Sequence, residues 1–276
     1  MREPEGNPEI GASIQCGSVL TNYHDIGSGE PVLLLHGSGP GVSAWANWRL
    51  TIHALQPKFR LLAPDLAGFG YSLSPEDMVY SRKAWLDQIV GFMDALELEH
   101  AHVIGNSFGG SMALSLAIAY PKRVSKLVLM GSVGVPFELT AGLDAVWGYE
   151  PSVENMRNIM RTFAYDQSLV GDDLAQLRYA ASMRPGIQEA YSRMFPPPRQ
   201  RWVDAMAHQE HEIRSLTHPT LLVHGRDDKV IPLLTSLTMM QWIDNSRLHV
   251  FGRCGHWTQI EHADVFSTLV ANFLEE

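Results

Sequence analysis

The sequence predicts an α/β fold with a mostly parallel sheet, flanked by helices and interrupted by one helical insertion. Three observations predict it. Short, solidly apolar runs recur along the chain, amphipathic helical patterns lie between them, and one long interval has helical patterns without such a run. Strand–helix alternation implies right-handed crossovers between parallel strands. The 276 residues suffice for a full hydrophobic core and an insertion.

The strands are predicted from two kinds of pattern. About the first ten residues look like a loose terminus. Apolar and polar positions then alternate over residues 14–25, which fits antiparallel strands. Solidly apolar runs fit strands that are buried on both faces, as in a parallel sheet. These runs are residues 31–35, 59–63, 102–105, 126–130, 220–224 and 248–251.

Helices are predicted between these strands. Residues 81–98 carry an apolar stripe with helical spacing, and residues 111–120, 233–243 and 263–274 are also helical in pattern. Residues 137–214 hold helical pieces such as 153–164 and 171–183. We therefore expect a core of residues 1–136 and 215–276 with a helical cap, residues 137–214. Such a cap belongs over the carboxyl edge of the sheet, where α/β sheets bind ligands.

Composition excludes several classes of protein. With 45% hydrophobic and 18% charged residues, the chain is not disordered as a whole. A net charge of −9 without a basic block argues against nucleic-acid binding. No apolar run approaches the ~20 residues of a membrane helix, and residues 1–13 lack the apolar centre of a signal peptide. Only Cys16 and Cys254 occur, so we expect a soluble, reduced, cytoplasmic protein.

The first chemical motif is Gly-Asn-Ser-Phe-Gly at residues 105–109. It follows one predicted strand and opens a predicted helix, which is the context of a nucleophile elbow. Small residues permit a sharp turn that exposes the side chain of Ser107. The start of the helix leaves free N–H groups near any developing negative charge. The motif therefore predicts a serine nucleophile.

A serine nucleophile needs a base and a carboxylate that orients the base. His256 follows the last predicted strand, and Asp227 and Asp228 follow the strand before it. Both groups should lie on the same sheet edge as Ser107. Spacing alone leaves the choice between Asp227 and Asp228 open. The other histidines near strands, His102, His224 and His249, are expected to have core or surface roles.

An oxyanion hole is predicted next to the serine. The glycine-rich stretch of residues 36–41 follows the first buried strand and can supply one backbone N–H; Phe108, after the nucleophile, supplies the second. The stretch is neither a phosphate-binding P-loop nor a dinucleotide-binding motif. His208 and His211 have no third ligand at metal spacing, so neither a metal nor a cofactor is expected. Asp65 is expected to hold a loop by hydrogen bonds.

Five stretches together resemble one known family: residues 36–49, 105–110, 142–149, 199–203 and 254–262. They look like those of the meta-cleavage product hydrolases. These are α/β-hydrolases that cut carbon–carbon bonds in the bacterial degradation of aromatic compounds. The likeness covers nearly the whole chain and is strongest to the branch that acts on monocyclic compounds. It implies an α/β-hydrolase fold with a helical cap.

The resemblance assigns roles to single positions. The nucleophile falls on Ser107, the base on His256 and the acid on Asp228, the second acidic residue after Gly-Arg. The oxyanion amides fall on Ser38 and Phe108. Groups for the carboxylate and dienolate end of the substrate fall on Asn47, Asn106, Arg184 and Trp257. A pocket for the other end is expected from Leu143, Val146, Trp147, Val230 and Ile231, whose bulk favours a small alkyl group.

The implied substrate is an anionic 2-hydroxy-6-oxo-2,4-dienoate, cleaved between C5 and C6 to 2-hydroxypenta-2,4-dienoate and a carboxylic acid. Attack by serine and direct attack by water both remain open. A homodimer or larger homo-oligomer is also implied. Two other functions share the motifs: a carboxylesterase and a non-catalytic receptor for small molecules. Haloalkane dehalogenases and epoxide hydrolases need an aspartate where Ser107 stands.

Overall fold

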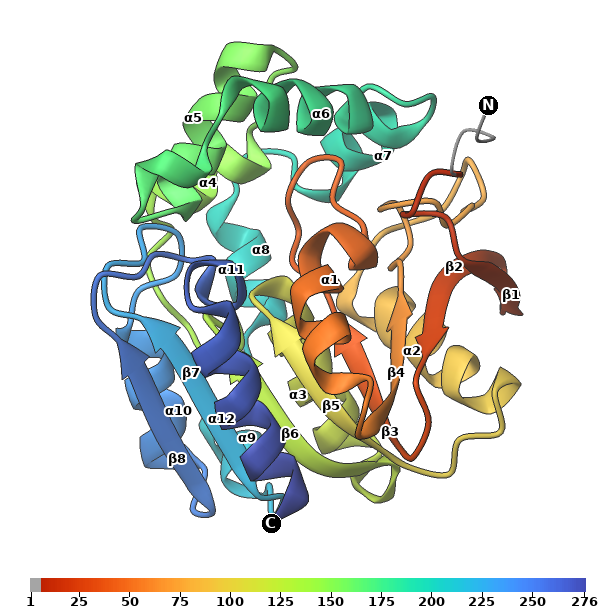
Figure 1. Cartoon of the computed structure of the whole chain (residues 1–276), viewed down its shortest axis with the longest axis vertical. Helices are drawn as coiled ribbons and strands as arrows, with labels where there is room; N and C mark the ends of the chain where they lie inside the picture. The colour runs from red at the N-terminus through yellow and green to blue at the C-terminus, as the bar shows by residue number, and fades with distance from the viewer. Residues whose placement is uncertain (1–5) are drawn as a thin grey trace.

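A computed structural model describes residues 6–276 and contains one eight-stranded sheet (Figure 1). The strand order is β1-β2-β4-β3-β5-β6-β7-β8. Strands β3 to β8 run parallel, and β1 and β2 are antiparallel at one edge. The strands are β1 (Ala12–Cys16), β2 (Val19–Ile26), β3 (Glu30–Leu35), β4 (Phe59–Pro64), β5 (Ala101–Asn106), β6 (Val124–Met130), β7 (Thr220–Gly225) and β8 (Ser246–Phe251).

Helices cover both faces of the sheet and one of its ends. α1, α11 and α12 lie on one face and α2, α3 and α10 on the other, while α4 to α7 lie across the carboxyl ends of the strands (Figure 1). The helices are α1 (Ala44–Leu55), α2 (Arg82–Ala95), α3 (Phe108–Ala119), α4 (Ala141–Trp147), α5 (Val153–Phe163), α6 (Asp172–Ser182), α7 (Ile187–Met194), α8 (Gln200–Met206), α9 (Glu210–Arg214), α10 (Leu234–Trp242), α11 (Thr258–Glu261) and α12 (Ala263–Glu275).

The solidly apolar strands are explained by the two hydrophobic layers. In β3, Val32 and Leu34 point into one layer, and Leu33 and Leu35 point into the other. All four side chains are fully buried. Burying each contributes roughly 1.5–3 kcal/mol, so a strand between two helix layers gains on both faces. The predicted α/β class and the six predicted strands are confirmed. The expectation that all six are buried on both faces is wrong for β8, because this strand lies at the edge of the sheet and only Phe251 in it is buried.

Two regions differ from expectation. Helix α1 was not predicted, although Ser43 caps it by accepting a hydrogen bond from Ala46 N at 3.1 Å and Trp48 and Ile52 form its buried stripe. About the first ten residues were expected to form a loose terminus, and this expectation is wrong from residue 7 onward. Residues 1–5 lie outside the part of the chain that the structure describes. Glu9 is buried, because its carboxylate accepts the Ser43 hydroxyl at 2.6 Å and pairs with Arg178 of α6.

Candidate active site

The turn between β5 and α3 holds Ser107 in a strained conformation, with φ of 55° and ψ of −115°. Glycines make this turn possible. A Cβ on Gly105 would lie 2.4 Å from Gly109 O, and a Cβ on Gly109 would lie 2.2 Å from Leu35 O. A non-glycine residue at positive φ costs about 1–3 kcal/mol, and such strain clusters at functional sites. The sharp strand–turn–helix geometry is that of a nucleophile elbow.

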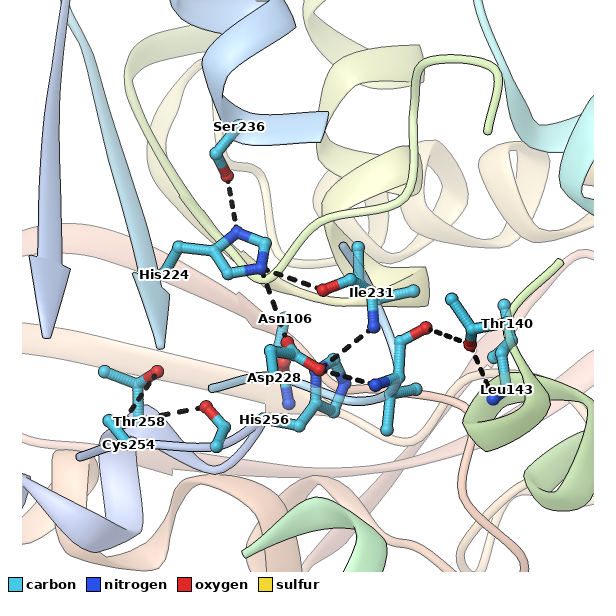
Figure 2. A network of polar contacts seen from close by, with 12 residues as sticks. Asn106, Thr140, Leu143, His224, Asp228, Ile231, Ser236, Cys254, His256 and Thr258 are labelled. Carbon is cyan, nitrogen blue, oxygen red and sulfur yellow. Dashed lines mark hydrogen bonds and ion pairs between the residues drawn. The ribbon is translucent and has the colours of Figure 1, made fainter. Parts of the chain in front are cut away.

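A carboxylate–imidazole pair lies beside the elbow. His256 Nδ1 lies 2.6 Å from Asp228 Oδ2, while Asp228 Oδ1 accepts the N–H groups of Val230 at 2.7 Å and Ile231 at 3.0 Å (Figure 2). Burial of Asp228 opposes its ionisation. The charge of His256 and hydrogen bonds from His224 and His256 outweigh burial, so the pKa of Asp228 is lowered. The carboxylate therefore stays charged and holds the imidazole ring in place.

The structure distinguishes the two neighbouring aspartates. Asp227 Oδ2 lies 3.4 Å from both Arg226 Nη2 and Cys254 N, and only Asp228 contacts His256. The sequence left this choice open until the resemblance was considered. Adjacent residues after a strand point in different directions, which is why one carboxylate reaches the histidine and the other does not.

The end of α5 fixes the backbone of His256. Its N–H donates to Phe163 O at 2.6 Å, and its ring stacks on the Phe163 ring with centroids 5.6 Å apart. Sequence reasoning did not single out Phe163. The only signal was its place as the last large apolar residue of the predicted helical piece 153–164. The helical segment between β6 and β7 thus contacts the base directly.

One cavity contains the serine and the histidine. It encloses about 740 Å³ of space between atoms, its open mouth included. Nine of the predicted site residues line it: Ser38, Asn47, Asn106, Ser107, Leu143, Val146, Val230, His256 and Trp257. Met156, Ile159 and Met160 of α5 add an apolar wall that was not predicted. Thr140 links two other lining residues, Leu143 and Val230. Its hydroxyl accepts the Leu143 N–H at 3.0 Å and donates to Val230 O at 2.7 Å.

Buried amide groups in the cavity are only partly satisfied. Asn47 Oδ1 accepts hydrogen bonds from Asn106 Nδ2 at 2.9 Å and Gly37 N at 3.2 Å. Within residues 6–276, Asn47 Nδ2, Asn106 Oδ1 and Gln259 Oε1 are buried without a partner. An unsatisfied buried polar group costs about 1–3 kcal/mol, so native proteins rarely keep one without a reason. These groups can bind the polar atoms of a ligand.

The two N–H groups that were predicted to form an oxyanion hole, those of Ser38 and Phe108, are free of protein acceptors in the described chain. Two residues of the helical segment contact Ser38. Trp147 Nε1 donates to Ser38 Oγ at 3.0 Å, and the Tyr191 hydroxyl, which donates to Val146 O at 2.7 Å, also lies 3.0 Å from Ser38 O. The prediction that Trp147 lines the cavity is therefore corrected. Its side chain is buried next to Ser38, because the indole N–H needs an acceptor and finds it at Ser38 Oγ.

Two other predicted residues lie outside the cavity. Arg184 stacks on the Tyr71 ring, 3.6 Å from its centroid, and donates to Gly70 O at 2.6 Å, so it faces a different hollow. Ile231 is buried beside the cavity and contributes its backbone, which donates to Asp228. The expectation that these two side chains line the cavity is corrected.

Arg178 of α6 is the arginine that lines the cavity. It pairs with Glu9, and its positive charge lowers the pKa of Arg49 further, after burial, which is the larger cause. Of these three charged groups, only the Arg178 guanidinium lines the cavity. In a chain with a net charge of −9, Arg178 thus places a positive charge at the wall of the cavity.

This fold and site define an α/β hydrolase with a serine, a histidine and a carboxylate at one rim. A family model described as alpha/beta hydrolase fold matches residues 30–263. The chain is 57% identical to a 2-hydroxymuconate semialdehyde hydrolase from Pseudomonas sp. strain CF600, over 100% of this chain and 98% of the relative. It is 58% identical to a 2-hydroxy-6-oxo-2,4-heptadienoate hydrolase from Pseudomonas putida, over 97% of each.

A solved structure agrees with these relatives. A variant of a meta-cleavage product hydrolase from Pseudomonas fluorescens IP01, CumD, superposes with a TM-score of 0.97 at 58% identity, over 98% of this chain and 99% of that one. The chain belongs to the meta-cleavage product hydrolases of the α/β-hydrolase family. It is an enzyme that hydrolyses carbon–carbon bonds. No helix within residues 6–276 is both long and apolar enough to cross a membrane.

Proposed function

We propose that this enzyme cleaves the C5–C6 bond of 2-hydroxy-6-oxo-2,4-dienoates that carry a small alkyl group, using Ser107, His256 and Asp228. The observation that supports this most directly is the 2.6 Å contact between His256 Nδ1 and Asp228 Oδ2, at the wall of a cavity that Ser107 also lines. A buried carboxylate fixes the imidazole tautomer and stabilises its protonated form. Nε2 is then the nitrogen that accepts the serine proton.

The reaction begins with a proton shift. The 2-hydroxyl group loses its proton and C5 takes one up, so the dienol becomes a ketone that serves as an electron sink for the later cleavage. Donors at the carboxylate end stabilise the negative charge that develops in this step. Asn47 Nδ2 is such a donor, since it is buried and without a partner in the described chain. The cavity therefore has a polar group for the charge that ketonisation creates.

Carbon–carbon cleavage follows at the C6 ketone. His256 takes the Ser107 proton, Oγ bonds to C6, and the N–H groups of Ser38 and Phe108 hold the oxyanion. The C5–C6 bond breaks, its electrons pass into the dienoate, and a proton completes 2-hydroxypenta-2,4-dienoate. Water, activated by His256, then releases the acyl group as a carboxylic acid. Each amide donor contributes roughly 3–4 kcal/mol to such a transition state.

We assign the substrate carboxylate to Arg178, in place of Arg184. Arg178 lines the cavity, and guanidinium binds carboxylates in a bidentate manner. At the other end, Leu143, Val146 and Val230 form an apolar wall with α5. This wall favours a small alkyl group at C6. The relatives named for 2-hydroxymuconate semialdehyde and 2-hydroxy-6-oxo-2,4-heptadienoate support a compact substituent.

The test is a comparison of substrates and of one variant. Dienoates with hydrogen, methyl, isopropyl and phenyl at C6 are followed by loss of their yellow absorbance, beside a nitrophenyl ester. We expect the hydrogen and methyl compounds to turn over fastest. Ser107→Ala should lose several orders of magnitude in turnover and still bind the coloured dienolate. Near wild-type turnover by this variant refutes the serine mechanism, and faster turnover of the ester favours a carboxylesterase.

We also propose that residues 137–214 act as a cap, that the protein is cytoplasmic and that it forms a homodimer or larger oligomer. The free thiols of Cys16 and Cys254 support a reducing compartment. Leu234, Leu237 and Met240 of α10 are exposed apolar side chains beside the sheet edge, and they support self-association. Sedimentation of the purified chain checks the oligomer, and a monomer at micromolar concentration contradicts it.

A further inference from the structure

His224 at the end of β7 lies directly behind the carboxylate of the site. Its side chain is fully buried. Nε2 lies 3.0 Å from Ile231 O and 3.5 Å from Asp228 Oδ2, and Nδ1 lies 2.7 Å from Ser236 Oγ in α10 (Figure 2). The sequence pattern suggested only a core or surface role for this residue. Its ring instead joins the strand, the acid-bearing turn and a helix.

The partners of His224 fix which nitrogen carries the proton. A carbonyl oxygen and a charged carboxylate only accept hydrogen bonds, so Nε2 must be the donor. In the neutral ring, Nδ1 then accepts a hydrogen bond from the Ser236 hydroxyl group. The carbonyl at 3.0 Å takes the main hydrogen bond, and Asp228 at 3.5 Å lies at the positive end of the same N–H dipole. The neutral ring can therefore satisfy all three neighbours only as the Nε2–H tautomer.

The carboxylate is therefore shared between two imidazoles. Asp228 Oδ2 faces His256 Nδ1 at 2.6 Å on one side and His224 Nε2 at 3.5 Å on the other, while Oδ1 is held by backbone N–H groups. We propose that His224 is a positioning residue that, through Asp228, holds down the basicity of His256. This proposal rests on the function proposed above. It assigns a role to a side chain that does not line the cavity.

The direction of the effect follows from charge sharing. The His224 N–H draws part of the Asp228 negative charge away from His256. Without it, more of that charge stabilises the protonated form of His256, and the pKa of His256 rises. Cys254 is a further titratable group nearby; its pKa is raised to about 12, mainly by burial, so it stays a neutral thiol. Asp227 and Glu261 contact the Cys254 side of the turn.

The experiment compares two substitutions of His224. His224→Leu removes the donor, whereas His224→Gln keeps an N–H at the position of Nε2. The acidic limb of kcat/KM against pH should move up by about 0.5–1 unit in His224→Leu and stay near wild type in His224→Gln. His218→Leu is the matched control. His218 is another buried histidine, at the other end of β7, with Nε2 2.8 Å from Pro121 O. This control should lose stability without a shift of the limb.

The outcomes separate positioning from simple packing. If His224→Leu and His218→Leu lose similar stability and neither moves the limb, the proposal is overturned. Should His224→Leu fail to fold, NMR of ¹⁵N-histidine-labelled wild type and His224→Gln supplies the test. We expect His224 in the neutral Nε2–H tautomer, and the opposite tautomer overturns the proposal.

The same spectra separate this proposal from the proposed function. The pKa of His256 can be followed by NMR without substrate, in wild type and in both His224 variants. A rise in His224→Leu alone supports the positioning role even if the dienoate turns out not to be the substrate. No rise overturns the positioning role, even if dienoates are turned over as proposed.

Discussion

Replacing Arg178 should weaken the binding of the dienoate, whereas replacing Arg184 should not. Both arginines come from the segment between β6 and β7. Arg178 lines the cavity, and Arg184 stacks on Tyr71 and faces another hollow. Methionine keeps most of the aliphatic stem and removes the guanidinium. Arg178→Met and Arg184→Met therefore form a matched pair that differs in access to the cavity.

The size of the effect can be worked out from the contacts. A hydrogen bond to a charged group contributes about 1.5–3 kcal/mol. Glu9 already occupies part of the Arg178 guanidinium, so we take about 2 kcal/mol for the substrate contact. At about 1.4 kcal/mol per factor of ten, KM for the dienoate should rise about 30-fold in Arg178→Met. In Arg184→Met, KM should stay within about twofold of wild type, because the half-buried Arg184–Tyr71 pair does not line the cavity.

The assay is steady-state loss of dienolate absorbance, with a nitrophenyl ester as a substrate that has no carboxylate. KM for the ester should not change in either variant. Arg178→Met leaves the buried Glu9 carboxylate unpaired, so Arg178→Met with Glu9→Gln is measured as well. A normal dienoate KM in both Arg178 variants refutes the assignment. A 30-fold rise of the dienoate KM in Arg184→Met would instead assign the substrate carboxylate to Arg184.

Three further predictions concern specificity, folding and pH. Leu143→Ala should raise the isopropyl-to-methyl ratio of kcat/KM about tenfold, since a methylene-sized change in a pocket shifts specificity by about 10–200-fold; an unchanged ratio would show that Leu143 does not limit the substituent. Gly109→Ala should yield little folded protein, because its Cβ would lie 2.2 Å from Leu35 O, and a wild-type melting temperature would contradict this. Burial lowers the pKa of His36 to about 4. The unfolded chain takes up that proton near pH 6.5, so stability should be complete above pH 6.5 and fall by up to about 3 kcal/mol towards pH 4. Urea unfolding of wild type and His36→Gln checks this, and equal slopes against pH in the two proteins would refute it.

The sequence predicted the sheet well because burial on both faces leaves a simple pattern. Strands such as β3 and β7 are solidly apolar, and their ends could be located within a few residues. The elbow, the histidine and the carboxylate all follow such ends. Parallel strands bring their carboxyl ends to one edge, so the meeting of His256 and Asp228 was a consequence of the fold class. Helix α1 escaped notice because the glycine-rich stretch before it was interpreted only as an oxyanion loop.

The helical segment was predicted less well, because helix faces carry weaker signals than strand ends. Side chains three or four residues apart share a face of a helix. In α6, Ala175, Ala181 and Ser182 are buried, and Arg178 stands three or four residues from each of them. Arg178 therefore lies on the buried face, whereas Arg184 comes after the helix has ended. The small residues around Arg178 were the available signal. They let the helix approach the loop at Gly41, where a Cβ would lie 2.8 Å from Ala181 C, and Arg178 on the same face lines the cavity. An arginine on the small-residue face of a cap helix is thus a better candidate for binding an anion than one in the loop that follows it.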